Sequence, residues 1–240
     1  MRRVAVVTGG TKGIGLAIAA RLAADGAEVI AAARHPADLP AGVRFVACDV
    51  SSADSVKSLF AGLARVDALV NAAGLAGPNP LSPDDPLWGA IIAANLNGPW
   101  YCCTAALDKL PDRTGRVVNI SSVLGLRGVP DQPAYCAAKH GLIGLTRSLA
   151  LARAPRGITV NAVCPGFIDT PWFEKGIPAQ TVERMRQGVA ASTPLKAAST
   201  AEDIAGAAIF FASPAARHVT GETLLVDAGT HLGMASLSMR

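Results

Sequence analysis

The sequence predicts an α/β fold: a doubly wound, seven-stranded parallel sheet with helices on both faces, in a single domain. Short apolar runs rich in Val, Ile and Ala alternate with longer Ala-rich helical patterns along the 240 residues. A chain that returns repeatedly to parallel strands needs a crossover each time, and the helical patterns provide these crossovers. Half of the residues are hydrophobic and only 5% are aromatic, which suits small-residue helices packed closely on a buried sheet.

Each element follows from its own pattern of apolar residues. The expected strands cover 4–10, 28–33, 43–50, 67–74, 115–122, 157–166 and 220–229. The expected helices cover 15–26, 53–66, roughly 87–110, 134–153 and 200–213. The connection RHPADLPAG (34–42) has two prolines within nine residues, so we expect a loop instead of a crossover helix there. No repeat or linker divides the chain, so one domain is expected over 1–240.

Composition argues against several classes of protein. The net charge of +4 comes from interspersed acids and bases without a basic run, so nucleic acid is not an expected partner. The five cysteines form no CxxC pair and no metal-ligand spacing with the four histidines, which favours buried free thiols and no metal. The apolar run near the N-terminus breaks at Thr8. It reads as a strand, no later segment reaches membrane-spanning length, and a cytoplasmic location is expected.

A glycine-rich turn, TGGTKGIG (8–15), follows the first expected strand and opens directly into a helix. Glycines permit positive φ and a close approach of the backbone to a pyrophosphate, and the helix start offers free N–H groups and a partial positive charge. This placement favours a Rossmann-type dinucleotide site over a purely structural turn. The residues expected to contact the cofactor are Gly9, Thr11, Lys12, Gly13, Ile14 and Gly15.

The end of the second expected strand indicates which dinucleotide is bound. Where an Asp or Glu would bind a free ribose 2′-hydroxyl, the chain has Ala33 followed by Arg34. No carboxylate repels a 2′-phosphate, and Arg34 and Lys12 are available to pair with it, so NADP(H) is favoured while NAD(H) stays open. The alternative is that both cations are merely exposed. Asp49, ending the third strand, either caps the next helix or accepts from the adenine amino group.

Tyr135 and Lys139 stand four positions apart in QPAYCAAKHG. On a helix they share a face, and Pro133 suits the first helical turn, which places Tyr135 near the helix start. An ammonium about 4–5 Å away would lower the pKa of the phenol from about 10 toward neutrality. The alternative is an ordinary helix carrying two unrelated side chains, and the pair by itself does not decide between them.

Two further residues complete a recognisable set. Ser122 ends the strand VVNISS thirteen residues before Tyr135, and Asn95 lies in the helical AANLNG. With the glycine loop, these residues and their spacing resemble the short-chain dehydrogenase/reductase family, and the resemblance runs from Thr8 to about Gly229. Matching segments are LVNAAG (69–74), GLTRSLA (144–150), GITVNAVCPGFIDT (157–170) and VTGETLLVDAG (219–229).

The resemblance implies a role for each member of this set. Tyr135 would be the general acid in carbonyl reduction and the base in alcohol oxidation. Lys139 would lower the pKa of Tyr135 and hold the nicotinamide ribose. Ser122, selected over Ser121 by the family spacing, would orient the substrate oxygen, and Asn95 would hold a water that links Lys139 to solvent.

The resemblance also implies cofactor contacts after the third, fourth and sixth expected strands. Besides Asp49, Arg34, Tyr135 and Lys139, they involve Val50, Asn71, Ala73, Gly74, Pro165, Gly166, Ile168 and Thr170. The chain departs from the family pattern at Ala72, where a second asparagine is usual, and at Ala228, where a glycine usually precedes Gly229. A backbone-mediated contact tolerates the first departure.

Within the family, the likeness is greatest to 3-oxoacyl-(acyl-carrier-protein) reductases and polyketide ketoreductases. A 3-oxoacyl thioester or related ketone is the expected substrate, free or on an acyl carrier protein that would dock on Arg113 and Arg156. The alternative for these arginines is an ordinary exposed position. A substrate loop is expected at about 171–199 and a tail at about 230–240. The residues expected along an apolar substrate flank are Leu124, Leu126, Trp172 and Phe173.

Three rival readings stay open. One is an NAD(P)-dependent dehydrogenase of a secondary alcohol, polyol, cyclic alcohol or steroid. The others are a dinucleotide-sensing regulator and a catalytically silent subunit, both disfavoured because Asn95, Ser122, Tyr135 and Lys139 are all present. The family further implies a homodimer or homotetramer built through the helices around 95–110 and 136–153.

Overall fold

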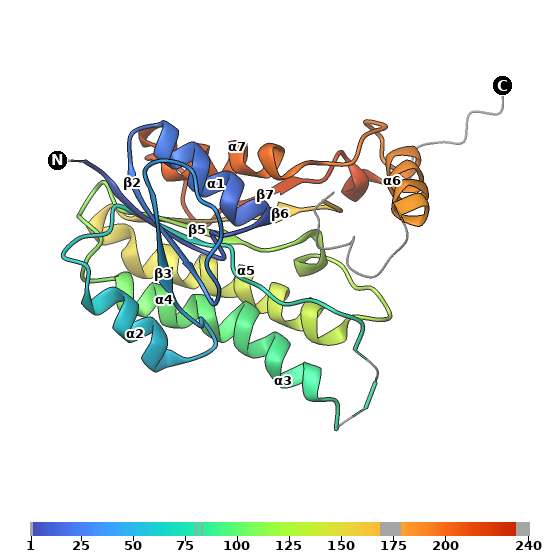
Figure 1. Ribbon diagram of the computed structural model, residues 1–240, viewed down its shortest axis with the longest axis horizontal. Helices are drawn as coiled ribbons and strands as arrows, with labels where there is room; N and C mark the ends of the chain where they lie inside the picture. Colours follow the sequence, from blue (N-terminus) through green and yellow to red (C-terminus); the bar gives the residue numbers. More distant parts are fainter. Residues whose placement is uncertain (1, 80, 83, 169–178, 234–240) are drawn as a thin grey trace.

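A computed structural model describes residues 2–79, 81–82, 84–168 and 179–233. Its centre is a sheet of seven parallel strands in the order β3-β2-β1-β4-β5-β6-β7 (Figure 1). The strands are β1 (Val4–Thr8), β2 (Glu28–Ala33), β3 (Val43–Ala47), β4 (Ala68–Asn71), β5 (Arg116–Ile120), β6 (Thr159–Pro165) and β7 (Thr223–Val226). The predicted fold is confirmed.

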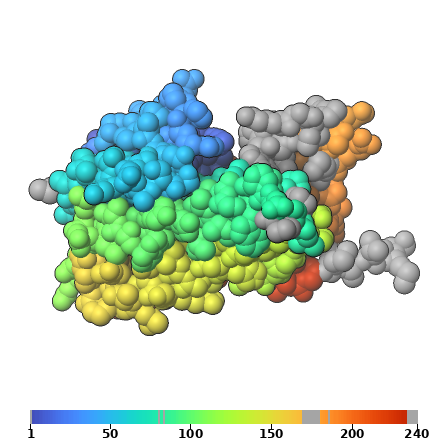
Figure 2. Space-filling view, turned by 90° about the horizontal axis from the view of Figure 1, so that it is seen from below, coloured from blue at the N-terminus to red at the C-terminus, as the bar shows by residue number. Residues whose placement is uncertain are grey.

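Helices cover both faces of this sheet. They are α1 (Gly13–Ala24), α2 (Ala53–Ala61), α3 (Pro86–Ile92), α4 (Gly98–Ala106), α5 (Pro133–Arg153), α6 (Ala179–Ser192) and α7 (Ala201–Ala212). In Figure 1, α1 and α7 lie on one side of the sheet and α2, α4 and α5 on the other. Figure 2 shows α2, α4 and α5 forming one continuous surface.

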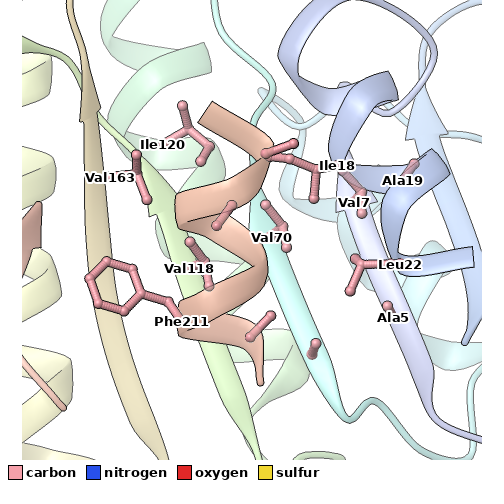
Figure 3. Packing of buried hydrophobic residues seen from close by; sticks show 14 of the residues in the cluster. Ala5, Val7, Ile18, Ala19, Leu22, Val70, Val118, Ile120, Val163 and Phe211 are labelled. Atoms are coloured by element: carbon pink, nitrogen blue, oxygen red, sulfur yellow. The ribbon is translucent and has the colours of Figure 1, made fainter. Parts of the chain in front are cut away.

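Two apolar layers hold the helices to the sheet. Between the sheet and the α1–α7 face, Ile18 and Leu22 of α1 and Phe211 of α7 pack on Val7 and Val118 of the strands (Figure 3). A second cluster fills the opposite face, where α2 and α4 cover strand residues that point the other way. Because both faces are covered, the strands read as continuous apolar runs instead of alternating ones.

The boundaries differ from expectation in an instructive way. β1, β3 and β4 end two or three residues before the predicted ends at 10, 50 and 74. The residues beyond each strand leave the sheet at its carboxyl edge and form loops. The connection from β2 to β3 contains no helix, as predicted. Helix α6 has no counterpart in the prediction, which assigned its polar sequence AQTVERMRQGVAAS to the substrate loop expected at about 171–199.

The predicted helix over 87–110 is divided into three pieces. α3 passes into a π-helical turn, Ala93–Asn97, which continues as α4. A π-helical turn accommodates one extra residue in the helix and re-aims the side chains within it. Among the helices of the described residues, none is long and apolar enough to cross a membrane.

Candidate active site

The carboxyl edge of the sheet gathers the predicted site residues from separate parts of the chain. The glycine loop follows β1, and Asn71 ends β4 and is followed by Ala72–Gly74. Ser121 and Ser122 follow β5, and Gly166 follows β6. β1, β4, β5 and β6 are neighbours in the sheet. In doubly wound sheets, ligands bind outside the carboxyl ends of such strands.

Helix α5 presents Tyr135 and Lys139 to this edge. The helix begins at Pro133, so Tyr135 stands in its first turn, as the sequence predicted. Lys139 is only 4% exposed. Its Nζ donates a hydrogen bond of 2.9 Å to the carbonyl oxygen of Ile120 on β5 and lies 5.4 Å from the centre of the Tyr135 ring. The lysine is thus held by the sheet, beside the phenol.

The two serines after β5 interact with different parts of α5. The Ser121 hydroxyl donates to the carbonyl oxygen of Lys139 at 3.1 Å, so this side chain fastens the backbone of α5. The Ser122 hydroxyl acts on Tyr135 and lowers its pKa, against the larger effect of burial. It also accepts from the Leu124 amide at 3.1 Å. The structure therefore brings Ser122, and not Ser121, to the phenol.

The expected lowering of the Tyr135 pKa is wrong for the chain by itself. Burial raises the pKa of Tyr135 to about 12, because a phenolate loses its hydration in this site. Burial likewise lowers the pKa of Lys139 to about 8, partly opposed by Cys164. The i,i+4 spacing gave the separation of the two groups but not their desolvation, which is the larger effect here.

Asn95 lies in the π-helical turn and is fully buried. Its Nδ2 donates to the carbonyl oxygens of Leu75 at 2.6 Å and Ile91 at 2.9 Å. Among the described residues its Oδ1 has no hydrogen-bond partner. A Cβ added to Gly74 would stand 2.7 Å from this Oδ1 and 4.0 Å from Lys139 Nζ. The asparagine, the glycine and the lysine therefore meet at one point, which the sequence placed on three separate segments.

The glycine loop fits a dinucleotide phosphate. Gly9 and Gly13 adopt positive φ of 67° and 51°. A Cβ on Gly9 would lie 2.9 Å from the Ala73 backbone, so the loop and the β4 end are in close contact. Helix α1 starts after Lys12 with no side-chain cap and no acidic residue in its first turn. Its first N–H groups are thereby left for an anionic ligand.

The remaining residues of the glycine loop surround the first turn of α1. Thr11, Gly13 and Ile14 are half-buried, Lys12 is exposed, and Gly15 is buried against the backbone of Gly9. The Thr8 hydroxyl accepts from the amides of Ala72 and Ala73 at 3.1 Å each. These two bonds connect the glycine loop to the residues that follow β4, so the two segments that border the proposed phosphate site are fixed relative to one another.

The adenosine end contains the predicted basic residue and the acid near it. Arg34 is exposed directly after β2. Asp49 Oδ1 accepts from the Ser51 amide at 3.0 Å and from the Ser51 hydroxyl at 2.7 Å. These bonds lower the Asp49 pKa, with a smaller contribution from the charge of Arg34. The cap of α2 is Ser52, so Asp49 shapes the turn before the helix and is not its N-cap.

Several other predicted cofactor residues lie along the same edge. Val50 is buried with its side chain against Gly98 at the start of α4. Asn71 directs its amide into the protein interior. Pro165 ends β6, and Ile168 bridges to Ser199. Thr170, and with it Trp172 and Phe173 of the expected substrate flank, lies outside the described residues.

Gly166 is held by a cluster that the sequence did not predict. A Cβ on Gly166 would meet Asp227 Cβ at 2.7 Å. Burial opposes ionisation of Asp227, but hydrogen bonds from His231, Thr230 and the Gly229 amide outweigh it and lower its pKa. An Asp directly after an apolar strand was the available signal, although its partners could not be read from the sequence.

The proposed carrier-docking arginines lie away from this edge. Arg113 precedes β5 and Arg156 precedes β6, so both stand at the amino end of the sheet. Arg156 follows α5, whose 21 residues span about 30 Å from the Tyr135 end. Its guanidinium donates to Asp112 and to the carbonyl oxygens of Leu107 and Leu110 at 2.7–2.8 Å. Within the described part of the chain, no cluster of three or more His, Cys, Asp or Glu residues could hold a metal ion.

Comparisons with known proteins agree with this geometry. A family model described as enoyl-(acyl carrier protein) reductase matches residues 9–231. The 3-oxoacyl-(acyl-carrier-protein) reductase FabG of Escherichia coli is 38% identical over 96% of this chain and 98% of its own length. A 3beta-hydroxysteroid dehydrogenase of Mediterraneibacter gnavus is 37% identical over 95% of this chain and 94% of its own length.

A solved structure gives the same result for the fold. The ligand-free aldohexose dehydrogenase of Thermoplasma acidophilum superposes with a TM-score of 0.91 and 32% identity, over 100% of this chain and 97% of that one. The matches cover nearly the whole length of the chain and of its relatives. This chain belongs to the short-chain dehydrogenase/reductase family of NAD(P)-dependent oxidoreductases that act on CH–OH and ketone groups.

Proposed function

We propose that this chain is an NADPH-dependent reductase that transfers hydride to the ketone of a 3-oxoacyl thioester or a related ketone. The observation that carries the proposal is that Tyr135 has Ser122 and Lys139 as neighbours at the carboxyl edge of the sheet, with Lys139 Nζ 5.4 Å from the centre of the phenol ring. The phenol is protonated at neutral pH, which is the form required to protonate a carbonyl oxygen, and burial raises its pKa further, to about 12.

Each neighbour has a proposed part in that step. When bound, the nicotinamide supplies the hydride. Ser122 holds the ketone oxygen beside Tyr135, which donates its proton to that oxygen. Lys139, fixed to Ile120, binds the nicotinamide ribose and keeps a positive charge near the phenol. Asn95, with its unsatisfied Oδ1, holds the water through which the proton is replaced.

The remaining cofactor contacts belong to the same proposal. The glycine loop binds the pyrophosphate, Arg34 and Lys12 bind the 2′-phosphate, and the turn at Asp49–Val50 borders the adenine. The backbone of Asn71–Gly74 and of Pro165–Gly166, with Ile168 and Thr170, borders the nicotinamide. The absence of a carboxylate at Ala33 supports NADPH over NADH.

The substrate class is supported by the names of several relatives. FabG enzymes and the monensin polyketide synthase putative ketoacyl reductase of Streptomyces virginiae, 37% identical over 95% of this chain, indicate a 3-oxoacyl thioester. Leu126 is 45% exposed after β5 and, with the half-buried Leu124, forms part of the proposed apolar substrate flank. Docking of an acyl carrier protein on Arg113 and Arg156 would have to serve another subunit, since both stand far from Tyr135.

A second candidate is oxidation of a secondary alcohol. The 3beta-hydroxysteroid dehydrogenase and the aldohexose dehydrogenase among the similar proteins favour a steroid or sugar alcohol with NAD(P)+. Both candidates use the same residues. For either, we propose a homodimer or homotetramer, supported by the exposed Trp100 of α4 and Leu151 of α5, at 46% and 80%.

Steady-state kinetics test the substrate and the site together. We expect reduction of acetoacetyl-CoA with NADPH, and Tyr135→Phe should lower kcat by about 10²–10⁴-fold while the proposed contacts of the glycine loop and Arg34 with NADPH remain. Wild-type turnover retained in Tyr135→Phe would refute the proposed site. No reduction of acetoacetyl-CoA together with rapid oxidation of a steroid or sugar alcohol would establish the second candidate instead.

The cofactor preference has its own test. Arg34→Ala should raise KM for NADPH about tenfold or more, because a charge-assisted bond to the 2′-phosphate is lost, and leave KM for NADH unchanged. Arg21→Ala, an exposed arginine in the last turn of α1, is the matched control and should change neither value. Equal effects of Arg34→Ala on both cofactors would contradict recognition of the phosphate.

A further inference from the structure

Three buried polar side chains form a continuous hydrogen-bonded line from the sheet to the helix that carries Tyr135. Asn71 of β4 and Asn119 of β5 are paired in register, and Asn71 Nδ2 donates to Asn119 Oδ1 at 2.8 Å. Asn119 Nδ2 donates in turn to Thr146 Oγ1 of α5 at 2.9 Å. The three residues are 2%, 0% and 0% exposed, so this line lies entirely in the core.

Each side chain of this line donates a hydrogen bond to the next one, from Asn71 to Asn119 to Thr146. The Thr146 hydroxyl accepts from Asn119 and donates to the carbonyl oxygen of Leu142, one turn back in α5, at 2.8 Å. Its donor and acceptor capacities are therefore both used. A buried polar group that loses its partner is costly, and linked bonds strengthen one another. The position of α5 in which Asn119 and Thr146 form their hydrogen bond is therefore favoured over a position shifted along the helix axis.

The end of β5 and the two residues after it also contact the proposed catalytic residues of α5. Ile120 accepts from Lys139 Nζ, Ser121 donates to the Lys139 carbonyl oxygen, and Ser122 acts on Tyr135. Four consecutive residues, 119–122, thus interact with α5. Thr146 stands seven residues beyond Lys139, about 10 Å along the axis, and so lies outside the reacting centre.

Apolar packing alone gives α5 little axial precision. The hydrophobic effect is non-directional, and the helix carries small residues between Tyr135 and Thr146, including Ala138, Gly141 and Gly144. Hydrogen bonds between fixed side chains have distance and angle requirements that apolar contacts lack. The Asn119–Thr146 hydrogen bond joins a side chain of the sheet to a side chain of the far half of the helix, where Leu149 and Ala150 make only apolar contacts.

We propose that Asn119 and Thr146 are positioning residues that fix α5 along its axis and thereby set the separation of Tyr135 from Ser122. The inference rests on the proposed roles of Tyr135, Ser122 and Lys139, and it extends the functional set to two residues that touch neither substrate nor cofactor. It also gives Asn71 a part, since its amide donates to Asn119 from the neighbouring strand β4 and so orients the Asn119 side chain.

Thr146→Val tests this inference, because valine keeps the shape of threonine and removes the hydroxyl. We expect kcat for acetoacetyl-CoA reduction to fall about 10- to 100-fold, the range for a small misplacement of reacting groups. The affinity for NADPH, measured by its fluorescence, should stay within about twofold, because the glycine loop is unaffected. The basic limb of the kcat–pH profile should move, and Thr146→Ser should restore both kcat and the profile.

Two comparisons separate positioning from mere stability. Thr159→Val removes a buried threonine hydroxyl that has no partner among the described residues, and should leave kcat and the pH profile unchanged. The double variant Asn119→Leu/Thr146→Val removes both partners of the Asn119–Thr146 bond, whereas Asn119→Leu alone leaves Thr146 without its donor. In both variants Asn71 Nδ2 keeps only its contact of 3.4 Å with Cys103 Sγ. Positioning predicts that the Tm of the double variant recovers relative to Asn119→Leu while kcat stays low.

Recovery of kcat together with Tm in the double variant would overturn the inference, as would wild-type kcat and pH profile in Thr146→Val. If Thr146→Val does not fold, the double variant and Thr146→Ser decide the question by the same criteria. Tyr135→Phe shows whether the underlying proposal fails. Full turnover in Tyr135→Phe would refute the proposed site. An inactive Tyr135→Phe together with a fully active Thr146→Val would refute only the positioning role of Asn119 and Thr146.

Discussion

At Tyr135 and Lys139, burial has a larger effect than the attraction between a cation and a phenol. The two side chains share one helix face, yet burial raises the pKa of Tyr135 and lowers the pKa of Lys139 to about 8. Each group is therefore driven toward its neutral form. The protein by itself therefore has a protonated phenol beside a lysine whose pKa is close to neutrality.

The buried lysine predicts a measurable dependence of stability on pH. The pKa of Lys139 falls from 10.5 in the unfolded chain to about 8 in the folded one, so folding expels a proton between these values and stability rises with pH there. Below pH 8 the buried ammonium is destabilising. We expect Lys139→Met to raise the free energy of unfolding at pH 7 by about 2–3 kcal/mol.

Urea denaturation of the cofactor-free protein at several pH values measures this effect. The advantage of Lys139→Met over the wild type should shrink between about pH 8 and pH 10, while Lys57→Met, an exposed lysine on α2, should show no such trend. A difference that stays constant with pH would mean that Lys139 does not titrate in this range.

At the scale of the element, the π-helical turn Ala93–Asn97 aligns the second helix layer with the site. It gives Asn95 two backbone acceptors and turns Leu96 toward α5, where a Cβ on Gly141 would stand 3.0 Å from the leucine side chain. The glycine permits this close approach of α5 to the turn. A regular helix over 87–110, as predicted, would have lacked the extra residue that makes both contacts.

The turn after β7 contains a strained residue. Ala228 has φ 54°, a left-handed conformation that costs a residue with a Cβ about 1–2 kcal/mol. Ala228→Gly removes this strain but adds freedom to the unfolded chain. We expect a net gain of about 0.5–1 kcal/mol in the free energy of unfolding, measured by urea denaturation.

A helical alanine is the control for that substitution. Ala20→Gly, inside α1, should destabilise the protein by about 1 kcal/mol. Destabilisation of similar size by Ala228→Gly would show that the turn does not hold the left-handed conformation in solution. The carbonyl oxygen of Ala228 accepts from the Leu195 amide at 3.2 Å, so the turn also anchors the segment that follows α6.

For the molecule as a whole, two covered sheet faces leave most thiols inaccessible. Cys48, Cys102, Cys103 and Cys164 are buried, and Cys136 is half-buried. Burial raises the pKa of each of the four, that of Cys103 to about 12. The thiolate is the reactive form, so both burial and ionisation protect these cysteines. The expectation of buried free thiols is confirmed for all but Cys136.

Thiol labelling of the native protein tests this packing. We expect Cys136 to react rapidly with an aromatic disulfide reagent at pH 8, and all five cysteines to react after denaturation. Cys136→Ser should abolish the fast phase, whereas Cys164→Ser should leave it intact. A fast phase that persists in Cys136→Ser would place a second thiol within reach of solvent and contradict the described core.

Much of the candidate site was accessible from the sequence, because its chemistry lies in short motifs. Tyr135 and Lys139 share one helix turn, and the glycine loop is a single run of residues, so spacing made them candidates and the family resemblance supplied their expected roles. Asn119 and Thr146 were not found, since a polar residue inside an apolar strand gives no sign of its partner until the topology places α5 beside β5. Helix α6 was missed because its polar sequence was assigned to the expected substrate loop, although its few apolar residues have a helical spacing.

The amino-acid pattern was enough to predict the sheet of parallel strands and the loop between β2 and β3. Together with the family resemblance, it also predicted the dinucleotide turn and the candidate site residues. These predictions were possible because strands, helices and motifs leave their marks in short runs of sequence. The tertiary structure was needed to show that burial raises the pKa of the Tyr135 phenol, that Ser121 and Ser122 have different partners, and that Asn71, Asn119 and Thr146 form one hydrogen-bonded line. Desolvation and hydrogen bonding across layers depend on which distant segments meet, and local spacing does not contain that information.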